Sequence, residues 1–259
     1  MTAGHEPRSA KTRSLWPREH GAYAQLGVPL LTALVLARPT TAALLLAAGA
    51  CLAFLANEPL LVVLGHRGPR VKAEAGRQAR VRLGVLAAGA IVCGGAGLAL
   101  APDHARLLCA VLAVPVLVLV AIAWRRAQHS LWGELVATIA LPGASAPIAA
   151  ASGVSLAIAG ELWLAWSIGF AASVVAVHDV IGNRRGRTRA TTVHAALLAA
   201  LAAIVGVVAF VRPLQAPAVP LVALSAVVAI LSPSPRKLRT IGVVLVVASL
   251  ASSALVAVR

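Results

Sequence analysis

The amino-acid sequence predicts an all-α polytopic membrane protein, a bundle of nine transmembrane helices with a cytoplasmic N-terminus. Two observations support this fold class. Hydrophobic residues make up 60% of the chain and charged residues only 12%, a composition typical of membrane proteins rather than of soluble domains. The apolar stretches are also close to the roughly 20 residues that a helix needs to cross hydrocarbon. Helices are expected because their backbone hydrogen bonds close within the segment.

The predicted order is a basic cytosolic tail at residues 1–18, followed by a single transmembrane domain at residues 19–259. The loops on the predicted outer side are tight, and none of them would hold a folded domain. The eighth apolar stretch is the shortest and is flanked by prolines. The predicted spans are residues 21–37, 41–64, 83–101, 107–124, 131–151, 162–180, 193–211, 217–231 and 241–258.

Two local features modify this simple pattern. Pro142 and Pro147 fall within the fifth span, and each removes a backbone hydrogen bond, so a bend is predicted there. Residues 71–82, which precede the third span, have a helix-forming composition. They predict a short interfacial helix on the cytoplasmic side.

The basic residues fix the orientation of the bundle. Nineteen of the 23 Lys and Arg residues lie in the N-terminal tail and in every second loop after it, and the other four lie singly on the opposite side. Because basic loops stay cytoplasmic, the N-terminus is expected inside and the C-terminus outside. This topology accounts for the net charge of +15, so nucleic acid is not an expected partner. Basic loops would attract anionic lipid heads or a phosphorylated substrate.

Four of the eight acidic residues lie at the predicted cytoplasmic ends of spans: Glu19, Glu58, Glu134 and Asp179. Ionisable groups in such positions usually face a bundle interior or a wet cavity and have partners. Histidines, amides and basic residues accompany them in the same loops. This composition suits a ligand that carries phosphate, bound directly by Arg and Lys or through a divalent metal.

Each acidic residue also has a simpler interpretation. Glu58 would pair with Arg67 or extend to the membrane surface, and Glu134 would complement a helix dipole at a helix start. Glu19 and His20 would anchor the chain at the interface. Asp179 is expected at the C-terminal end of a helix, where the dipole disfavours an anion, and this position indicates a functional role.

Two short segments resemble motifs of the UbiA superfamily of intramembrane prenyltransferases. The segment Asp179-Val180-Ile181-Gly182-Asn183-Arg184 resembles the second aspartate motif, and Asn57-Glu58 stands at the place of the first. The resemblance implies nine helices around a cavity that opens to the cytoplasm. In that superfamily, carboxylates hold magnesium ions that bridge to a diphosphate. Leu61, Gly65 and Asn183 stand where further acids are found, so a single divalent ion is expected here.

The resemblance implies roles for particular residues, with an isoprenyl diphosphate as the substrate and Mg²⁺ as the cofactor. Asp179, Glu58 and Asn183 would hold the ion. Asp179 would take part in prenyl transfer, with His178 or His20 as the general base because imidazole titrates near neutral pH. The diphosphate would be bound by Asn57, Arg67, Arg70, Lys72, Arg184 and Arg187.

The chain is also similar to the YwiC-like membrane proteins of bacteria. The similarity rests on Trp16-Pro17-Arg18-Glu19-His20-Gly21-Ala22-Tyr23, on Pro29 and on Asn57-Glu58-Pro59-Leu60. That family usually has Trp at the position of Tyr23. The similarity implies a multi-pass protein of the bacterial inner membrane, in contact with membrane lipids, with Glu19 and His20 in its site.

Two other function classes fit the same sequence. Broken helices and buried ionisable groups are also found in transporters, which would here carry a small anion or a lipid. The missing acids of the two motifs fit a non-catalytic membrane partner of another enzyme. Replacement of Asp179 separates the classes, since an enzyme would lose turnover and a partner protein would tolerate the change.

Overall fold

The computed structural model describes residues 15–17, 20–183, 188–212, 216, 218–231, 233–234 and 237–257. These residues form ten α-helices and contain no β-strand, so the predicted all-α class is confirmed. The helices are α1 (His20–Leu36), α2 (Thr41–Val63), α3 (Pro69–Leu100), α4 (Asp103–Trp124), α5 (Leu131–Gly143), α6 (Ser145–Ala151), α7 (Leu156–Asn183), α8 (Thr188–Val211), α9 (Ala218–Leu231) and α10 (Leu238–Ala257).

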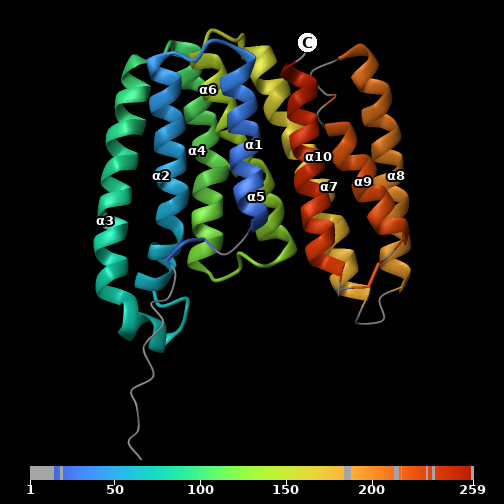
Figure 1. Ribbon diagram of the computed structural model, residues 1–259, viewed down its shortest axis with the longest axis horizontal. Coiled ribbons are helices and arrows are strands. Elements are labelled where there is room, and N and C mark those ends of the chain that lie inside the picture. The colour runs from blue at the N-terminus through green and yellow to red at the C-terminus, as the bar shows by residue number, and fades with distance from the viewer. Residues whose placement is uncertain are drawn as a thin grey trace, which may run out of the picture.

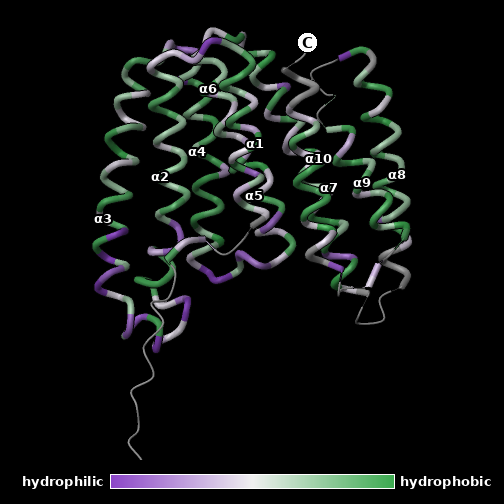
Figure 2. Tube along the Cα trace, viewed as in Figure 1, coloured by the Kyte–Doolittle hydropathy of each residue, from purple (hydrophilic) through white to green (hydrophobic). Residues whose placement is uncertain are grey.

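The helices run roughly side by side, and α1 begins at the lower edge of the bundle while α10 ends at its upper edge (Figure 1). Within the described residues, six helical segments are long and apolar enough to cross a membrane, with α5 and α6 taken together as one segment. Three shorter apolar segments lie in α1, α9 and α10. Figure 2 shows hydrophobic residues through the middle of the bundle and many hydrophilic ones at the lower ends of α2, α3, α4 and α5. The lower edge is therefore the side that the sequence predicts to be cytoplasmic, and the count of nine crossings stays a prediction.

The third span is much longer than the sequence predicts. Residues 71–82 do not form a separate helix, because no proline separates them from the apolar stretch that follows, and α3 has 32 residues. At 1.5 Å per residue its length is about 48 Å, well beyond the roughly 30 Å of hydrocarbon. Gly68, with φ 95°, and Pro69 start the helix. The basic first turns of α3 therefore extend past the membrane boundary.

The predicted bend in the fifth span is confirmed as a break between α5 and α6. Pro147 has no N–H to donate to the carbonyl of Gly143, and the chain turns there between Gly143 and Ser145. The whole of α6 is buried. Trp163 of α7 is hydrogen-bonded to α5 near the break, since its indole N–H donates to the carbonyl of Ile139 over 2.8 Å.

Packing is uneven across the bundle. The main hydrophobic core contains residues of α1, α2, α4, α6 and α7, with Trp166 fully buried at its centre. A second cluster joins α7 to α8, α9 and α10. In contrast, α3 packs almost entirely on α2 and barely touches α4. Gly49 and Gly97 allow this pair of helices to approach closely, because a Cβ on Gly49 would lie 2.9 Å from the backbone N of Gly94 and one on Gly97 would lie 2.8 Å from that of Leu46.

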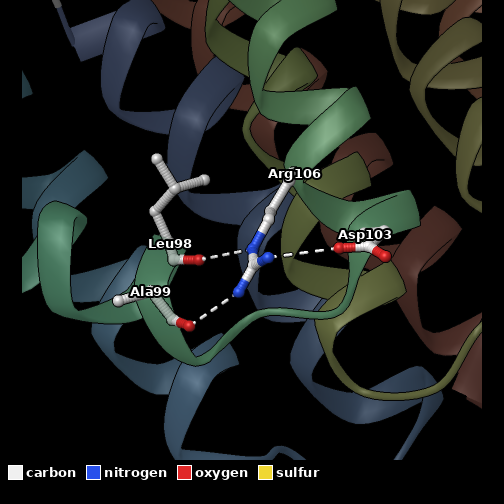
Figure 3. Close-up of polar contacts among 4 residues, drawn as sticks. All are labelled: Leu98, Ala99, Asp103 and Arg106. Carbon is white, nitrogen blue, oxygen red and sulfur yellow. Dashed lines mark hydrogen bonds and ion pairs between the residues drawn. The ribbon is translucent and has the colours of Figure 1, made fainter.

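Arg106 ties the end of α3 to the start of α4 (Figure 3). Its Nε donates to the carbonyl of Leu98 over 3.1 Å, and Nη2 donates to that of Ala99 over 2.8 Å. Nη1 donates to Asp103 over 3.1 Å. The guanidinium group thus binds two carbonyls of the last turn of α3 and places a positive charge at the negative end of the helix dipole. The hydrogen bonds of Arg106 therefore link α3 to α4 at this corner, although the two helices pack little against each other elsewhere.

Replacement of Arg106 by Gln is expected to lower the free energy of unfolding by about 1 kcal/mol, the usual contribution of such hydrogen bonds. The control is Asp103→Asn. Its carboxylate is almost fully exposed, so the loss of its ion pair should cost well under about 1 kcal/mol. Unfolding of both variants by denaturant titration in detergent micelles measures the difference. Equal losses would show that the carbonyl bonds of Arg106 do not stabilise the corner.

Candidate functional site

The end of α2 folds back so that Arg67 meets Glu58. Gly65, with φ 79°, ends the helix, and the N–H groups of His66 and Gly65 donate to the carbonyls of Leu61 and Val62. This is a Schellman arrangement, in which glycine supplies the left-handed residue. The turn brings the guanidinium of Arg67 over the carboxylate of Glu58.

Both oxygens of Glu58 are bound by Arg67. Nε donates to Oε1 over 2.9 Å and Nη2 donates to Oε2. Only 3% of the Glu58 side chain is exposed, and 22% of that of Arg67. The two-pronged geometry suits guanidinium and carboxylate and stabilises the ionised acid in a buried place. The ion-pair interpretation of Glu58 is therefore confirmed.

A second cluster surrounds the end of α7, where two neighbouring residues contact different helices. Nε2 of His178 lies 2.9 Å from Oε2 of Glu134 on α5. Oδ1 of Asp179 lies 2.6 Å from Nδ1 of His194 on α8. Neighbouring residues on a helix point about 100° apart, so α7 is joined to α5 on one side and to α8 on the other. We call these four residues the α7 cluster.

One oxygen in the α7 cluster is unused. Asp179 is buried, with 10% of its side chain exposed, and its Oδ2 has no hydrogen-bond partner among the residues that the structure describes. A buried acceptor without a partner is costly. An ionised carboxylate can only accept, so this oxygen is available to a donor or a cation.

The helix start of α5 also explains the position of Glu134. Ser130 caps the helix, since its hydroxyl accepts from the N–H of Gly133 over 3.1 Å. Glu134 lies in the first turn, where a carboxylate complements the helix dipole. Glu134 also contacts His178 and so links α5 to α7, which the helix-dipole interpretation does not explain.

His194 is a member that the sequence analysis missed. It lies 15 residues from Asp179 along the chain. The available signal was a titratable side chain at the cytoplasmic start of the predicted seventh span. Helix packing, rather than any motif, makes it the partner of Asp179.

The predicted site residues do not all come together. Glu58 lies at the end of α2, next to α3, and the α7 cluster lies at the ends of α5, α7 and α8, on the other side of the bundle (Figure 1). Arg70 pairs with Glu74 at the surface, and Asn57 and Lys72 are exposed. Glu19, Arg184 and Arg187 lie outside the described residues, as do the side chains of His20 and Asn183.

The described residues do not by themselves form a ligand set for the magnesium ion that the UbiA resemblance implies. Glu58 would have to give up both bonds to Arg67 to become a ligand. Among the residues that the structure describes, no three His, Cys, Asp or Glu side chains come together to hold a metal. Within the described part of the chain, Asp179 has a buried carboxylate oxygen without a hydrogen-bond partner. Magnesium binding therefore stays a prediction.

The segment before α1 is fixed against α3. Leu15 is buried with Val62, Val71, Ala75 and Ala79. Arg82 lies over the ring of Trp16, with its Cζ 4.6 Å from the ring centroid, a distance typical of a cation–π contact. These contacts hold the start of the Trp16–Tyr23 motif at the lower end of α3.

Fold and composition together define a multi-pass helical membrane protein whose buried charges gather at one end. Within that class the chain belongs to the YwiC-like protein family, which matches residues 16–150, more than half of its length. The match contains the Glu58–Arg67 pair and Glu134 but ends before α7. No curated protein and no solved structure matches the chain.

Proposed function

We propose that this protein binds an isoprenyl diphosphate at the cytoplasmic end of the bundle and transfers its prenyl group there. The observation that carries the proposal is the unused Oδ2 of the buried Asp179 in the α7 cluster. Such an oxygen is a place for a substrate donor or a cation, and it lies at the end where the basic loops are. Apolar helix walls above it would suit a prenyl tail.

Basic residues would meet the charge of the diphosphate. Lys72 and Arg67 belong to the α2–α3 side of the bundle, away from the α7 cluster, so neither is expected to contact a diphosphate held there. Arg184 and Arg187 follow α7 in the sequence. Arginine and lysine bind phosphate oxygens directly, so this form of recognition does not depend on a shared metal site.

The α7 cluster would serve the reaction itself. An ionised Glu134 accepts from Nε2 of His178, so that nitrogen carries the hydrogen and Nδ1 is the basic one. Departure of pyrophosphate breaks the C–O bond of the prenyl carbon, and an acceptor hydroxyl or water then forms the new bond to that carbon. His178 would take the proton that the acceptor loses.

The test is binding of geranylgeranyl diphosphate to the purified protein, and release of pyrophosphate from it, in magnesium and in chelator. We expect Arg184→Gln to weaken binding about tenfold, the effect of losing about one charge-assisted hydrogen bond. Asp179→Asn should keep binding and lose pyrophosphate release. The control is Asp103→Asn, the same change at the opposite end of the bundle, which should leave both unchanged.

Other outcomes of the same experiment have clear meanings. Binding that requires magnesium and is lost in Asp179→Asn would favour the metal site that the resemblance implies. No binding in any condition would exclude the prenyltransferase proposal and favour a non-catalytic membrane partner.

A second candidate function is transport of a small anion or a lipid. The break between α5 and α6 favours it, because discontinuous helices often line transporter sites. Flux of a labelled lipid phosphate across proteoliposomes, without release of pyrophosphate, would support transport over transfer.

A further inference from the structure

An open groove of about 390 Å³ lies between α2, α3 and α4 and is also lined by residues at the break between α5 and α6. Its walls include Gly49 and Ala53 of α2, Gly94 of α3 and Cys109 and Leu112 of α4. Ala144, Pro147 and Ile148 line it from the broken helix. The groove exists because α3 packs on α2 and hardly touches α4. Its lining is almost entirely apolar.

The corner between α3 and α4 borders this groove. Leu98 lines the groove, and its carbonyl accepts a hydrogen bond from Nε of Arg106. Arg106 also precedes Cys109, another lining residue, by three positions, which places the two on neighbouring parts of one helix face. The guanidinium group of Arg106 therefore stands beside the groove, about half exposed.

Arg106 has donors to spare at this position. A guanidinium group carries five N–H bonds, and one each on Nε, Nη1 and Nη2 is used by Leu98, Asp103 and Ala99. One N–H on each Nη atom remains. The ion pair with Asp103 is weak because that carboxylate is almost fully exposed. A phosphate group could thus be bound by two N–H groups of Arg106.

We propose that this groove binds one acyl chain of an anionic membrane phospholipid, with the lipid phosphate on Arg106. The groove lies along apolar helices that cross the hydrocarbon, where an unfilled space loses its dispersion contacts. A lipid chain is the flexible apolar group already present at that depth. A guanidinium group binds phosphate oxygens through paired N–H groups, and Arg106 supplies one beside this groove.

Two neighbouring glycines give a matched test. A Cβ on Gly94 or on Gly95 would meet no atom within 4 Å, so both positions accept a larger side chain. Only Gly94 lines the groove. Gly94→Leu should therefore fill the groove, and Gly95→Leu should leave it open. Ala53→Leu fills the groove from α2 if Gly94→Leu does not fold.

The measurement is native mass spectrometry of protein released from nanodiscs that contain equal amounts of phosphatidylglycerol and phosphatidylcholine. We expect wild type and Gly95→Leu to retain one phosphatidylglycerol molecule. Gly94→Leu should bind it about tenfold more weakly, which corresponds to about 1.4 kcal/mol. Equal retention by the two glycine variants, with unchanged thermal unfolding, would overturn the proposal.

Variants of Arg106 test the head group separately. Arg106→Gln should lose the preference for phosphatidylglycerol over phosphatidylcholine, and Arg106→Lys should keep it, because the charge remains. A preference unchanged in Arg106→Gln would remove the phosphate contact from the proposal. If Gly94→Leu instead abolishes a dimer that wild type forms, the occupant of the groove is a helix of a second copy and the lipid proposal is wrong.

Discussion

Replacement of Arg67 by Ala is expected to destabilise the protein by about 3 kcal/mol, the lower end of the range for breaking a buried ion pair. The cost arises because Glu58 stays behind. Its side chain is 3% exposed and both of its oxygens are bound by Arg67. The lower end of the range applies because 22% of the Arg67 side chain is exposed.

The control for this prediction is Arg70→Ala, which removes the same residue type three positions away. Arg70 and Glu74 pair at the surface, so the change should cost under about 1 kcal/mol. Both are measured by denaturant titration in detergent micelles. The double variant Glu58→Leu with Arg67→Leu should recover most of the loss, since replacing both members removes the unpaired charge. Similar losses for Arg67→Ala and Arg70→Ala would contradict the prediction.

The second large effect is expected at the contact between α2 and α3. A methyl group on Gly97 would lie 2.8 Å from the backbone N of Leu46, and one on Gly49 would lie 2.9 Å from that of Gly94. Backbone atoms inside a helix do not move aside easily, so the two helices must separate. Each Gly→Ala change should destabilise the protein by about 1 to 3 kcal/mol. Separation matters greatly for α3, because α2 is its main partner.

Gly95→Ala is the matched control, with no atom within 4 Å of the added Cβ. Alanine stabilises a helix relative to glycine by up to about 1 kcal/mol, so this change should be neutral or stabilising. The opposite sign at Gly97 and Gly95 is the decisive comparison. A neutral Gly97→Ala variant would mean that the helices pack less closely than the structure shows.

The sequence predicted local features of the site better than distant ones. Glu58 and Arg67 are nine residues apart, and a single turn at Gly65 decides that they meet. Glu134 and His178 were both singled out, but nothing in their sequence positions, 44 residues apart, pairs them. Likewise, Asp179 was recognised from its position at the end of a helix, and its partner His194 was not.

By itself, the sequence determined the helical class, the apolar segments, the break in the fifth span and the side on which charges gather. These follow from composition, proline positions and the cost of burying backbone and charge in lipid, which act residue by residue. Only the tertiary structure decided that Glu134 meets His178, that Asp179 meets His194 and that α3 stands apart from α4. Those contacts depend on how helices rotate and cross, which side-chain packing across the whole bundle sets. For the same reason, the groove beside Arg106 was not predictable from either helix alone.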